Sequence, residues 1–193
     1  MAGTYGTGDF SFNYADSWAK LPNGMTLLEC PGVAVDSHDN VFVLTRGEHP
    51  IWVFDQQGNF LRTFGEGLFS ENRTHGLYIA HDDSLLVAVG RQFGPTAKGV
   101  WLVKLDETNG KKLWTGDVWK GDCCAGGFFE IADLLNLPGG DVALVTGHFD
   151  AKFAPVGSRI VRMDGSGKAI WKRNVPVLGV EYVEAAAARP DGS

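Results

Sequence analysis

The sequence predicts an all-β protein, and three observations lead to this prediction. Glycine makes up 26 of the 193 residues, about twice its usual share, with no collagen-like period. Hydrophobic residues make up 44% of the chain and fall in short runs between Asx and Gly turn signals. No segment shows a helical apolar period of useful length. The length allows one large domain or two small ones.

One layout of four strands occurs three times along the chain. A strand led by glycine is followed by a second strand, a third strand that closes on aspartate, and a fourth strand after a glycine turn. The recurring residues are Gly32, Gly76, Gly127 and Gly179 as leading glycines, Asp55, Asp106 and Asp164 as closing aspartates, and Gly58, Gly110 and Gly167 as turn glycines. The leading glycines are 44, 51 and 52 residues apart. Four short strands at this period are typical of β-propeller blades.

The repeats predict about four blades' worth of chain. The predicted units are one propeller-type domain over 1–193, four-stranded blades at about 31–65, 75–116 and 126–173, and single strands at 10–21 and 179–193. The first single strand would be the outermost strand of a preceding blade, and the second would be the innermost strand of a fourth. Because these two strands cannot meet, we expect a propeller that is either incomplete or completed by self-association, as a homo-oligomer that covers the open blade edges.

Charge and cysteine content exclude several classes of protein. With 17 basic and 23 acidic residues, the net charge of −6 argues against nucleic-acid and membrane partners. No apolar run approaches the roughly 20 residues of a membrane span. No signal peptide is visible, so the location stays open, and it is cytoplasmic if the N-terminus is complete. The three cysteines cannot form a disulfide framework, and we expect Cys30 to be a small buried side chain.

The first part of the chain, from Gly6 to about Val87, resembles the NHL-repeat propellers, and among them the peptidyl-α-hydroxyglycine α-amidating lyases. The matching text is GVAVDSHDNVFVLTRGEHPIWVFDQQGNFLRTFGEGLF, followed by THGLYIAHDDSLLV. Two short runs are more specific to the lyase branch, RGEH at 46–49 and HGL at 75–77. Most NHL propellers are binding scaffolds, so these two runs carry the functional part of the resemblance.

The resemblance implies a metal site and a substrate contact. A zinc ion would be held by three histidines from different blades, and His75 occupies the first of these positions. Arg46 would bind the substrate carboxylate, and a structural calcium ion would take the backbone carbonyls of Val33 and Leu77. The lyases split a peptide that ends in α-hydroxyglycine into a peptide amide and glyoxylate. Zinc suits this reaction as a Lewis acid on the hydroxyl group, and the arginine fork suits a carboxylate.

The sequence departs from the lyases at the other site positions. His81 and Asp82 fall in a turn of the same blade as His75, and His148 follows a second strand, so neither histidine stands where a second zinc ligand would. No tyrosine stands in the motif that carries the family's base. Because a catalytic zinc needs about three protein ligands, we expect an incomplete active site with weak turnover or none.

From Gly99 onward the sequence is similar to the Trp-containing repeats of secreted bacterial propellers, which resemble quinoprotein blades. Trp114 and Trp171 stand in equivalent places, and we expect them to wedge between blades. Three functions stay open. They are a lyase homologue with an incomplete site, a non-catalytic propeller scaffold that binds a peptide or protein on its loop face, and a quinoprotein-like envelope propeller. Whether the chain is an enzyme is therefore open at this point.

Overall fold

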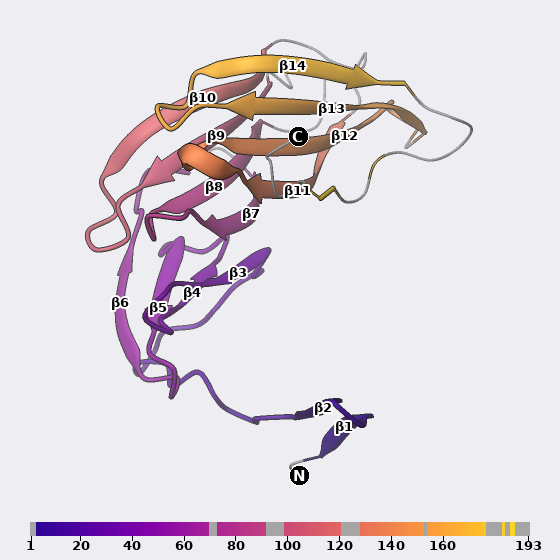
Figure 1. The fold of residues 1–193 in the computed structure, drawn as a ribbon. Helices are drawn as coiled ribbons and strands as arrows, with labels where there is room; N and C mark the ends of the chain where they lie inside the picture. Colours follow the sequence, from indigo (N-terminus) through magenta and orange to yellow (C-terminus); the bar gives the residue numbers. More distant parts are fainter. Residues whose placement is uncertain are drawn as a thin grey trace.

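The structure, a computed structural model, describes residues 3–69, 73–91, 99–120, 128–152, 154–176, 183 and 186–187. The strands form one two-stranded and three four-stranded antiparallel sheets (Figure 1). The all-β prediction is confirmed, since the helical structure in these ranges is a single 3₁₀ turn at Pro138–Gly140. No helix in the described part of the chain is long and apolar enough to cross a membrane.

Each four-stranded sheet is a meander in which strands adjacent in sequence pair with each other. The first sheet contains β3 (Gly32–Val35), β4 (Val41–Leu44), β5 (Ile51–Phe54) and β6 (Phe60–Phe64). The second sheet contains β7 (Arg73–Ile79), β8 (Leu85–Arg91), β9 (Gly99–Leu105) and β10 (Lys112–Lys120). The third sheet contains β11 (Phe128–Asn136), β12 (Val142–Phe149), β13 (Pro155–Met163) and β14 (Ala169–Val175). One sheet thus falls in each of the three segments whose repeats predicted four strands.

The turns between the third and fourth strands have the local chemistry that the repeats predicted. The closing aspartates Asp55, Asp106 and Asp164 each accept a hydrogen bond from the backbone N–H two residues later, at 2.9–3.0 Å. The turn glycines Gly58, Gly110 and Gly167 have φ between 70° and 81°. Glycine adopts this left-handed conformation without a steric penalty, so these turns determine where each fourth strand begins.

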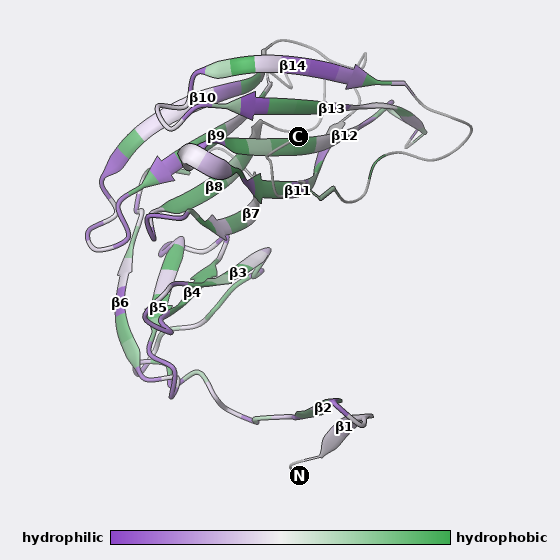
Figure 2. Ribbon diagram, in the orientation of Figure 1, coloured by the Kyte–Doolittle hydropathy of each residue, from purple (hydrophilic) through white to green (hydrophobic). Residues whose placement is uncertain are grey.

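Two apolar cores hold the three sheets face to face. The first core, between the first and second sheets, includes Leu44 and Leu85, and the second core, between the second and third sheets, includes Leu86 and Leu144. Leu85 and Leu86 are neighbours on β8 and point to opposite faces, because side chains alternate along a strand. The second sheet therefore contributes to both cores, and its central strands are strongly hydrophobic (Figure 2).

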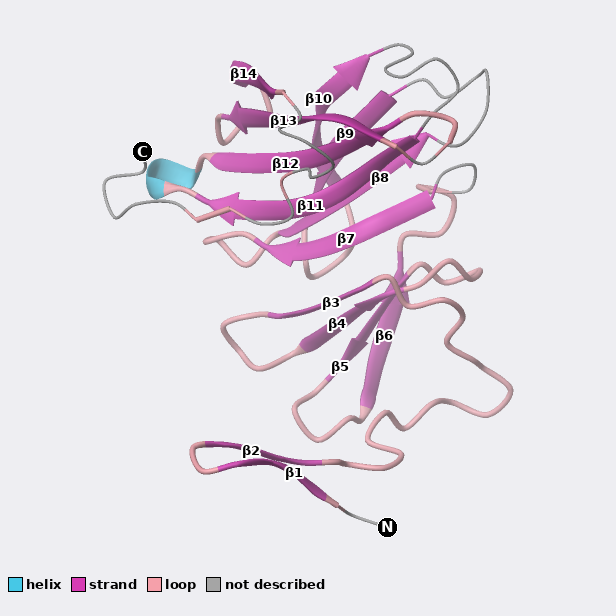
Figure 3. Cartoon of the chain, turned by 90° about the vertical axis from the view of Figure 1, so that its right-hand side faces the viewer, coloured by secondary structure: helices cyan, strands magenta, loops and turns pink. Residues whose placement is uncertain are grey.

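The first strands of the three sheets lie together on one side of the molecule. β3 lies against β7, and β7 lies against β11 (Figure 3). The first contact requires glycine at position 32, since a Cβ atom on Gly32 would lie 2.9 Å from the backbone nitrogen of Leu77. Across the second contact, the side-chain amide of Asn136 donates to the carbonyl of Ile79 at 2.7 Å. These contacts position β3 and β7, the strands that carry three of the four predicted site residues.

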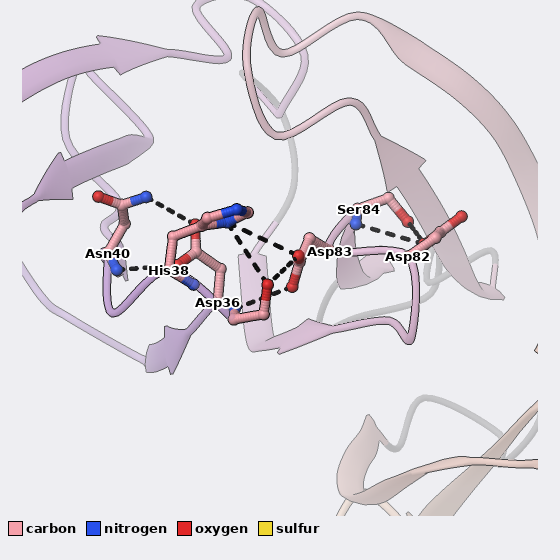
Figure 4. Close-up of polar contacts among 7 residues, drawn as sticks. Asp36, His38, Asn40, Asp82, Asp83 and Ser84 are labelled. Carbon is pink, nitrogen blue, oxygen red and sulfur yellow. Dashed lines mark hydrogen bonds and ion pairs between the residues drawn. The ribbon is translucent and has the colours of Figure 1, made fainter.

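A further contact between the first two sheets joins their hairpin turns (Figure 4). Ser37, after β3, donates to the carboxylate of Asp83, after β7, from its backbone N–H at 2.9 Å and from its hydroxyl at 2.5 Å. Within the first turn, buried Asp36 accepts hydrogen bonds from the backbone N–H and the side-chain amide of Asn40, each at 2.8 Å. The two sheets are therefore joined at their turns as well as through the core.

The N-terminal residues differ from the single strand expected at 10–21. Only β2 (Phe10–Asn13) is a strand there, and it pairs with β1 (Thr4–Thr7) in a hairpin. The reason is the two-residue turn that begins at Gly8, whose φ of 59° is the conformation that such a hairpin needs. Beyond the hairpin, Lys20 forms an isolated parallel bridge with Asn59 at the start of β6.

Two other expectations concern the segment before β3 and the end of the chain. Cys30 is exposed, so the prediction that it is buried was wrong; it lies in irregular chain directly before β3. The strand expected at 179–193 lies outside the described residues except at 183 and 186–187. The backbone N–H of Val183 donates to the hydroxyl of Ser158 at 2.9 Å, which places this residue beside the third sheet.

Candidate functional site

Arg46 lies in the loop between β4 and β5 and reaches across to the second sheet. One guanidinium nitrogen, Nη1, donates to Glu29 Oε2 at 2.8 Å, and the other, Nη2, donates to the carbonyl of Thr74 at 3.3 Å. The Arg46 side chain is 25% exposed and that of Glu29 is 69% exposed. Thr74 directly precedes His75 in β7. The structure thus brings Arg46 to the strand that carries the other residue of the lyase-like pair.

His75 occupies a special position in β7. Thr74 pairs with Val89 and Gly76 pairs with Ala88, so His75 is an extra residue in the ladder with β8. Such a bulge leaves one residue unpaired, and bulges are common next to active sites. The His75 side chain lies outside the described part of the chain, so its role as a zinc ligand stays a prediction.

The two residues expected to offer carbonyls to calcium lie on neighbouring strands. Val33 is the second residue of β3 and Leu77 lies in β7, and the two strands touch where Gly32 approaches Leu77. The Val33 side chain is 64% exposed, whereas the Leu77 side chain is 4% exposed and packs in the first core. Val33, His75 and Leu77 therefore lie on the two strands of the β3–β7 junction, and Arg46 reaches β7 from the β4–β5 loop. Nothing described assigns a cation to this region.

A pocket of about 180 Å³ is lined by the chain neighbours of Arg46, although Arg46 itself is not part of its lining. Its lining residues are Gly24, Met25, Thr26 and Leu28 from the segment before β3, Thr45, Gly47, Glu48 and His49 from the β4–β5 loop, and Trp52 from β5. The RGEH run thus provides part of the pocket wall. The volume is below the roughly 300–1,000 Å³ of sites for drug-sized ligands, so the pocket fits one side chain or terminal group.

His49 is held firmly in the pocket wall. Its Nδ1 lies 2.8 Å from Glu66 Oε1, and its carbonyl accepts a hydrogen bond from the indole N–H of Trp52 at 2.8 Å. Partial burial raises the pKa of Glu66, but the hydrogen bond with His49 outweighs it, and the pKa lies below its usual value. These contacts give His49 a structural role in shaping the pocket.

Two buried polar atoms at the Arg46 junction have no hydrogen-bond partner within the described residues. They are Nε of Arg46 and Oγ1 of Thr74. An unpaired buried polar group costs about 1–3 kcal/mol, and in folded proteins such a group calls for a specific explanation, such as a bound water or ligand. Nε of Arg62 is also unpaired, but this arginine lies at the outer contact of the first two sheets. The predicted site thus has unused hydrogen-bonding capacity.

The other histidines of interest lie elsewhere. His81 is in the exposed turn after β7, where neighbouring Asp82 pairs with Lys104 at 2.8 Å. Partial burial raises the pKa of Asp82, but hydrogen bonds from Lys104 and Ser84 outweigh it and lower that pKa to about 2. His148 lies inside β12, a correction to the expectation that it follows this strand. Within the described ranges, no three His, Cys, Asp or Glu side chains gather into a metal site.

Sequence reasoning missed Glu29 and the segment 24–28 that closes the pocket. This segment has no strand period and no motif, so no signal in the sequence pointed to it. Glu29 has a φ of 46°, which is uncommon for a residue with a side chain, and it pairs with an arginine 17 residues away. Only the folded chain reveals this pair.

The chain was compared with known proteins. No protein-family model matches it, and no curated protein is significantly similar to it. The resemblance to the lyases therefore rests on the RGEH and HGL runs and on the junction where they lie.

Proposed function

We propose that this protein is a β-propeller homologue of the peptidyl-α-hydroxyglycine α-amidating lyases with an incomplete active site. The observation that carries the proposal is the approach of Arg46 to the backbone beside His75. The two lyase-like runs lie in different sheets, yet they meet at one junction. Such an arrangement is what a shared substrate site requires, and chance matches to two short motifs have no reason to converge.

The stacking of the sheets supports the propeller part of the proposal. Three consecutive meanders pack face to face, and their first strands gather on one side. In a propeller of the NHL type, four-stranded blades surround an axis with their first strands innermost. The first sheet packs on the second as the second packs on the third. Further sheets added in the same way would surround such an axis.

The substrate would be a peptide with a free carboxylate at its end. The guanidinium of Arg46 pairs with exposed Glu29 in this structure, and a peptide carboxylate would replace one carboxylate with another at the same charged fork. The neighbouring pocket would take the side chain next to that terminus. Arg46 would thereby orient the terminus beside His75.

For the metal ions, the proposal names candidate ligands and assigns no catalytic step. Zinc, when bound, would supply Lewis-acid polarisation of the substrate hydroxyl group. The described side chains do not offer the three ligands that such an ion needs, so no step is assigned to it. Backbone carbonyls of Val33 and Leu77 remain proposed calcium ligands, since calcium prefers oxygen atoms of this kind.

A second candidate is a non-catalytic scaffold that binds a peptide or protein on the same loop face. The Glu29–Arg46 ion pair favours it, because an arginine that is already neutralised binds the carboxylate of a lyase substrate less strongly. Zinc content separates the two candidates. Tightly bound zinc in chelator-free protein that is lost in His75→Ala would favour the lyase homologue, and a well-folded protein without zinc would favour the scaffold.

Peptide binding tests the site itself. Isothermal titration would compare an α-hydroxyglycyl peptide with the corresponding peptide amide, which lacks the carboxylate. We expect Arg46→Ala to weaken binding of the acid by about tenfold or more, the loss of one charge-assisted contact. Glu29→Gln should strengthen binding, because it frees the guanidinium. Arg62→Ala is the control, an arginine with an unpaired Nε outside the site. Equal affinity of the acid and the amide for the parent protein would overturn the proposal.

A further inference from the structure

The pocket of about 180 Å³ combines apolar and polar lining residues. The apolar part comes from Met25 and Leu28 in the segment before β3 and from Trp52 in β5. The β4–β5 loop contributes polar residues, among them Glu48 and His49. A ligand group that matches this lining therefore has an apolar part and a polar part.

Glu48 provides a negative charge in the pocket lining. Its side chain is exposed, and its carboxylate has no hydrogen bond or ion pair within the described residues. Two carboxylates next to the pocket are already paired, Glu29 with Arg46 and Glu66 with His49, each at 2.8 Å. The residues that line the pocket are all described, and they include no lysine or arginine. The Glu48 carboxylate is thus available to a cationic group of a ligand.

The loop that carries Glu48 is held in one shape by hydrogen bonds on both sides of this residue. The hydroxyl of Thr45 donates to the carbonyl of His49 at 2.8 Å and accepts the backbone N–H of Gly47 at 3.2 Å. The same carbonyl accepts the indole N–H of Trp52 at 2.8 Å. Because these contacts fix the backbone around position 48 before a ligand arrives, binding costs little further ordering of the loop.

The pocket and the proposed carboxylate site are neighbours along two segments of the chain. Leu28 and Gly47 line the pocket, and the residues next to them, Glu29 and Arg46, form the ion pair of the carboxylate site. The backbone N–H of Arg46 donates to the carbonyl of Leu28 at 3.1 Å, which joins the two segments at this point. A peptide whose terminal carboxylate lies at Arg46 therefore has the residue before its terminus close to the pocket.

We propose that this pocket selects a basic side chain, lysine or arginine, at the position before the terminal residue of the bound peptide. The aliphatic stem would pack on Met25, Leu28 and Trp52, and the cationic head would pair with Glu48. Long basic side chains combine such a buried stem with a charged head close to water. Glu48 would thus determine specificity, since it attracts a basic side chain and repels an acidic one. The inference rests on the proposed function for the position of the peptide terminus.

Four peptides test the proposal. They carry lysine or norleucine before a C-terminal glycine, and the glycine ends in a free acid or in an amide. Norleucine keeps a straight aliphatic stem without the ammonium group, and glycine lacks the hydroxyl group on which cleavage depends. By isothermal titration at low salt, we expect the lysine acid to bind about threefold to fivefold more tightly than the norleucine acid, the effect of a partly exposed ion pair. This preference should decrease as the salt concentration rises.

Substitutions at Glu48 test its role directly. Glu48→Gln should remove the preference for lysine, and Glu48→Lys should reverse it, so that a glutamate peptide binds more tightly than the lysine peptide. Both variants should fold, which circular dichroism checks, because the Glu48 side chain has no hydrogen bond within the described residues to lose. Asp9→Asn, which removes an exposed carboxylate in the turn of the N-terminal hairpin, is the control and should keep the preference. A preference for lysine that survives Glu48→Gln would overturn the proposal.

The same four peptides separate this proposal from the proposed function. Equal affinity of the lysine and norleucine acids, with both acids bound more tightly than the amides, overturns the selection of a basic side chain and leaves the carboxylate site in place. A preference for lysine in acids and amides alike, with no preference for the acid, overturns the carboxylate site and leaves a pocket for basic side chains. A protein that binds none of the four peptides overturns both.

Discussion

His148 is the residue whose burial has the clearest energetic consequence. It lies in β12 with 6% of its surface exposed, and its Nε2 is 3.0 Å from the hydroxyl of Thr146. Burial, and secondarily the charge of Arg159, lower its pKa from 6.5 to about 4. The native state therefore holds a neutral imidazole at a pH where an unfolded chain would carry the proton.

This pKa shift predicts a loss of stability in acid. Between pH 6.5 and about 4 the unfolded chain binds a proton that the native chain does not, so the free energy of unfolding falls as the pH falls. The full loss is about 3 kcal/mol, from roughly 1.4 kcal/mol for each pH unit. Urea unfolding at a series of pH values measures it. His148→Gln should flatten the slope in this window, and parallel slopes in variant and parent would contradict the prediction.

At the scale of elements, one side-chain donor joins the fourth strand of each sheet to a turn of the next sheet. Arg62 in β6 donates to the Glu107 carbonyl, and Trp114 in β10 donates to the Gly165 carbonyl. Trp114 and Trp171 stand at equivalent positions of β10 and β14, but Trp114 donates to Gly165 whereas Trp171 has no such acceptor within the described ranges. The two tryptophans therefore hold equivalent positions in their strands, but only Trp114 has a hydrogen-bond acceptor among the described residues. Comparing substitutions at the two positions therefore measures how much this hydrogen bond contributes to the free energy of unfolding.

We predict that Trp114→Phe destabilises the monomer by about 1–2 kcal/mol, since it removes a hydrogen bond and leaves the carbonyl of Gly165 without this donor. Trp171→Phe should cost clearly less, because the half-buried Trp171 side chain has no such acceptor among the described residues and phenylalanine keeps most of its apolar contact. Thermal and urea unfolding of dilute protein measure both. Equal destabilisation by the two substitutions would show that Trp171 already has a partner in the monomer.

The strands were predictable from the sequence because their signals are local. Asp55 and Gly58 determine a turn within four residues, and the apolar runs on either side define the strands that it joins. The N-terminal hairpin was missed because Gly8 was not read as a turn signal. The approach of Arg46 to Thr74 was outside the reach of local patterns, since it depends on how two sheets pack. The ion pair of Glu29 with Arg46 was also not predictable, because no sequence motif contains both residues.

In the described part of the chain, the three four-stranded sheets form a stack in which apolar cores join the first to the second and the second to the third. Within the described part of the chain, the first and second cores share no residue, and the second sheet stands between them. In such a linear arrangement, stability is approximately a sum of the stabilities of the units and of nearest-neighbour interfaces. Perturbations in different cores should therefore act independently, and perturbations in one core should not.

Double-mutant cycles test this independence. Ile51 and Val87 lie in the first core and Val161 lies in the second, all fully buried. Ile51→Val should cost about 0.5–1.5 kcal/mol, because it removes one buried methyl group, and Val87→Ala and Val161→Ala should each cost about 1–3 kcal/mol, because each removes two. The changes at Ile51 and Val161 should add within about 0.5 kcal/mol, whereas those at Ile51 and Val87 should deviate by more, since they line one core. Chemical unfolding of the single and double variants gives the coupling energies. Coupling as large between the cores as within one would mean that the middle sheet transmits strain from face to face, and the stack would then behave as one continuous core.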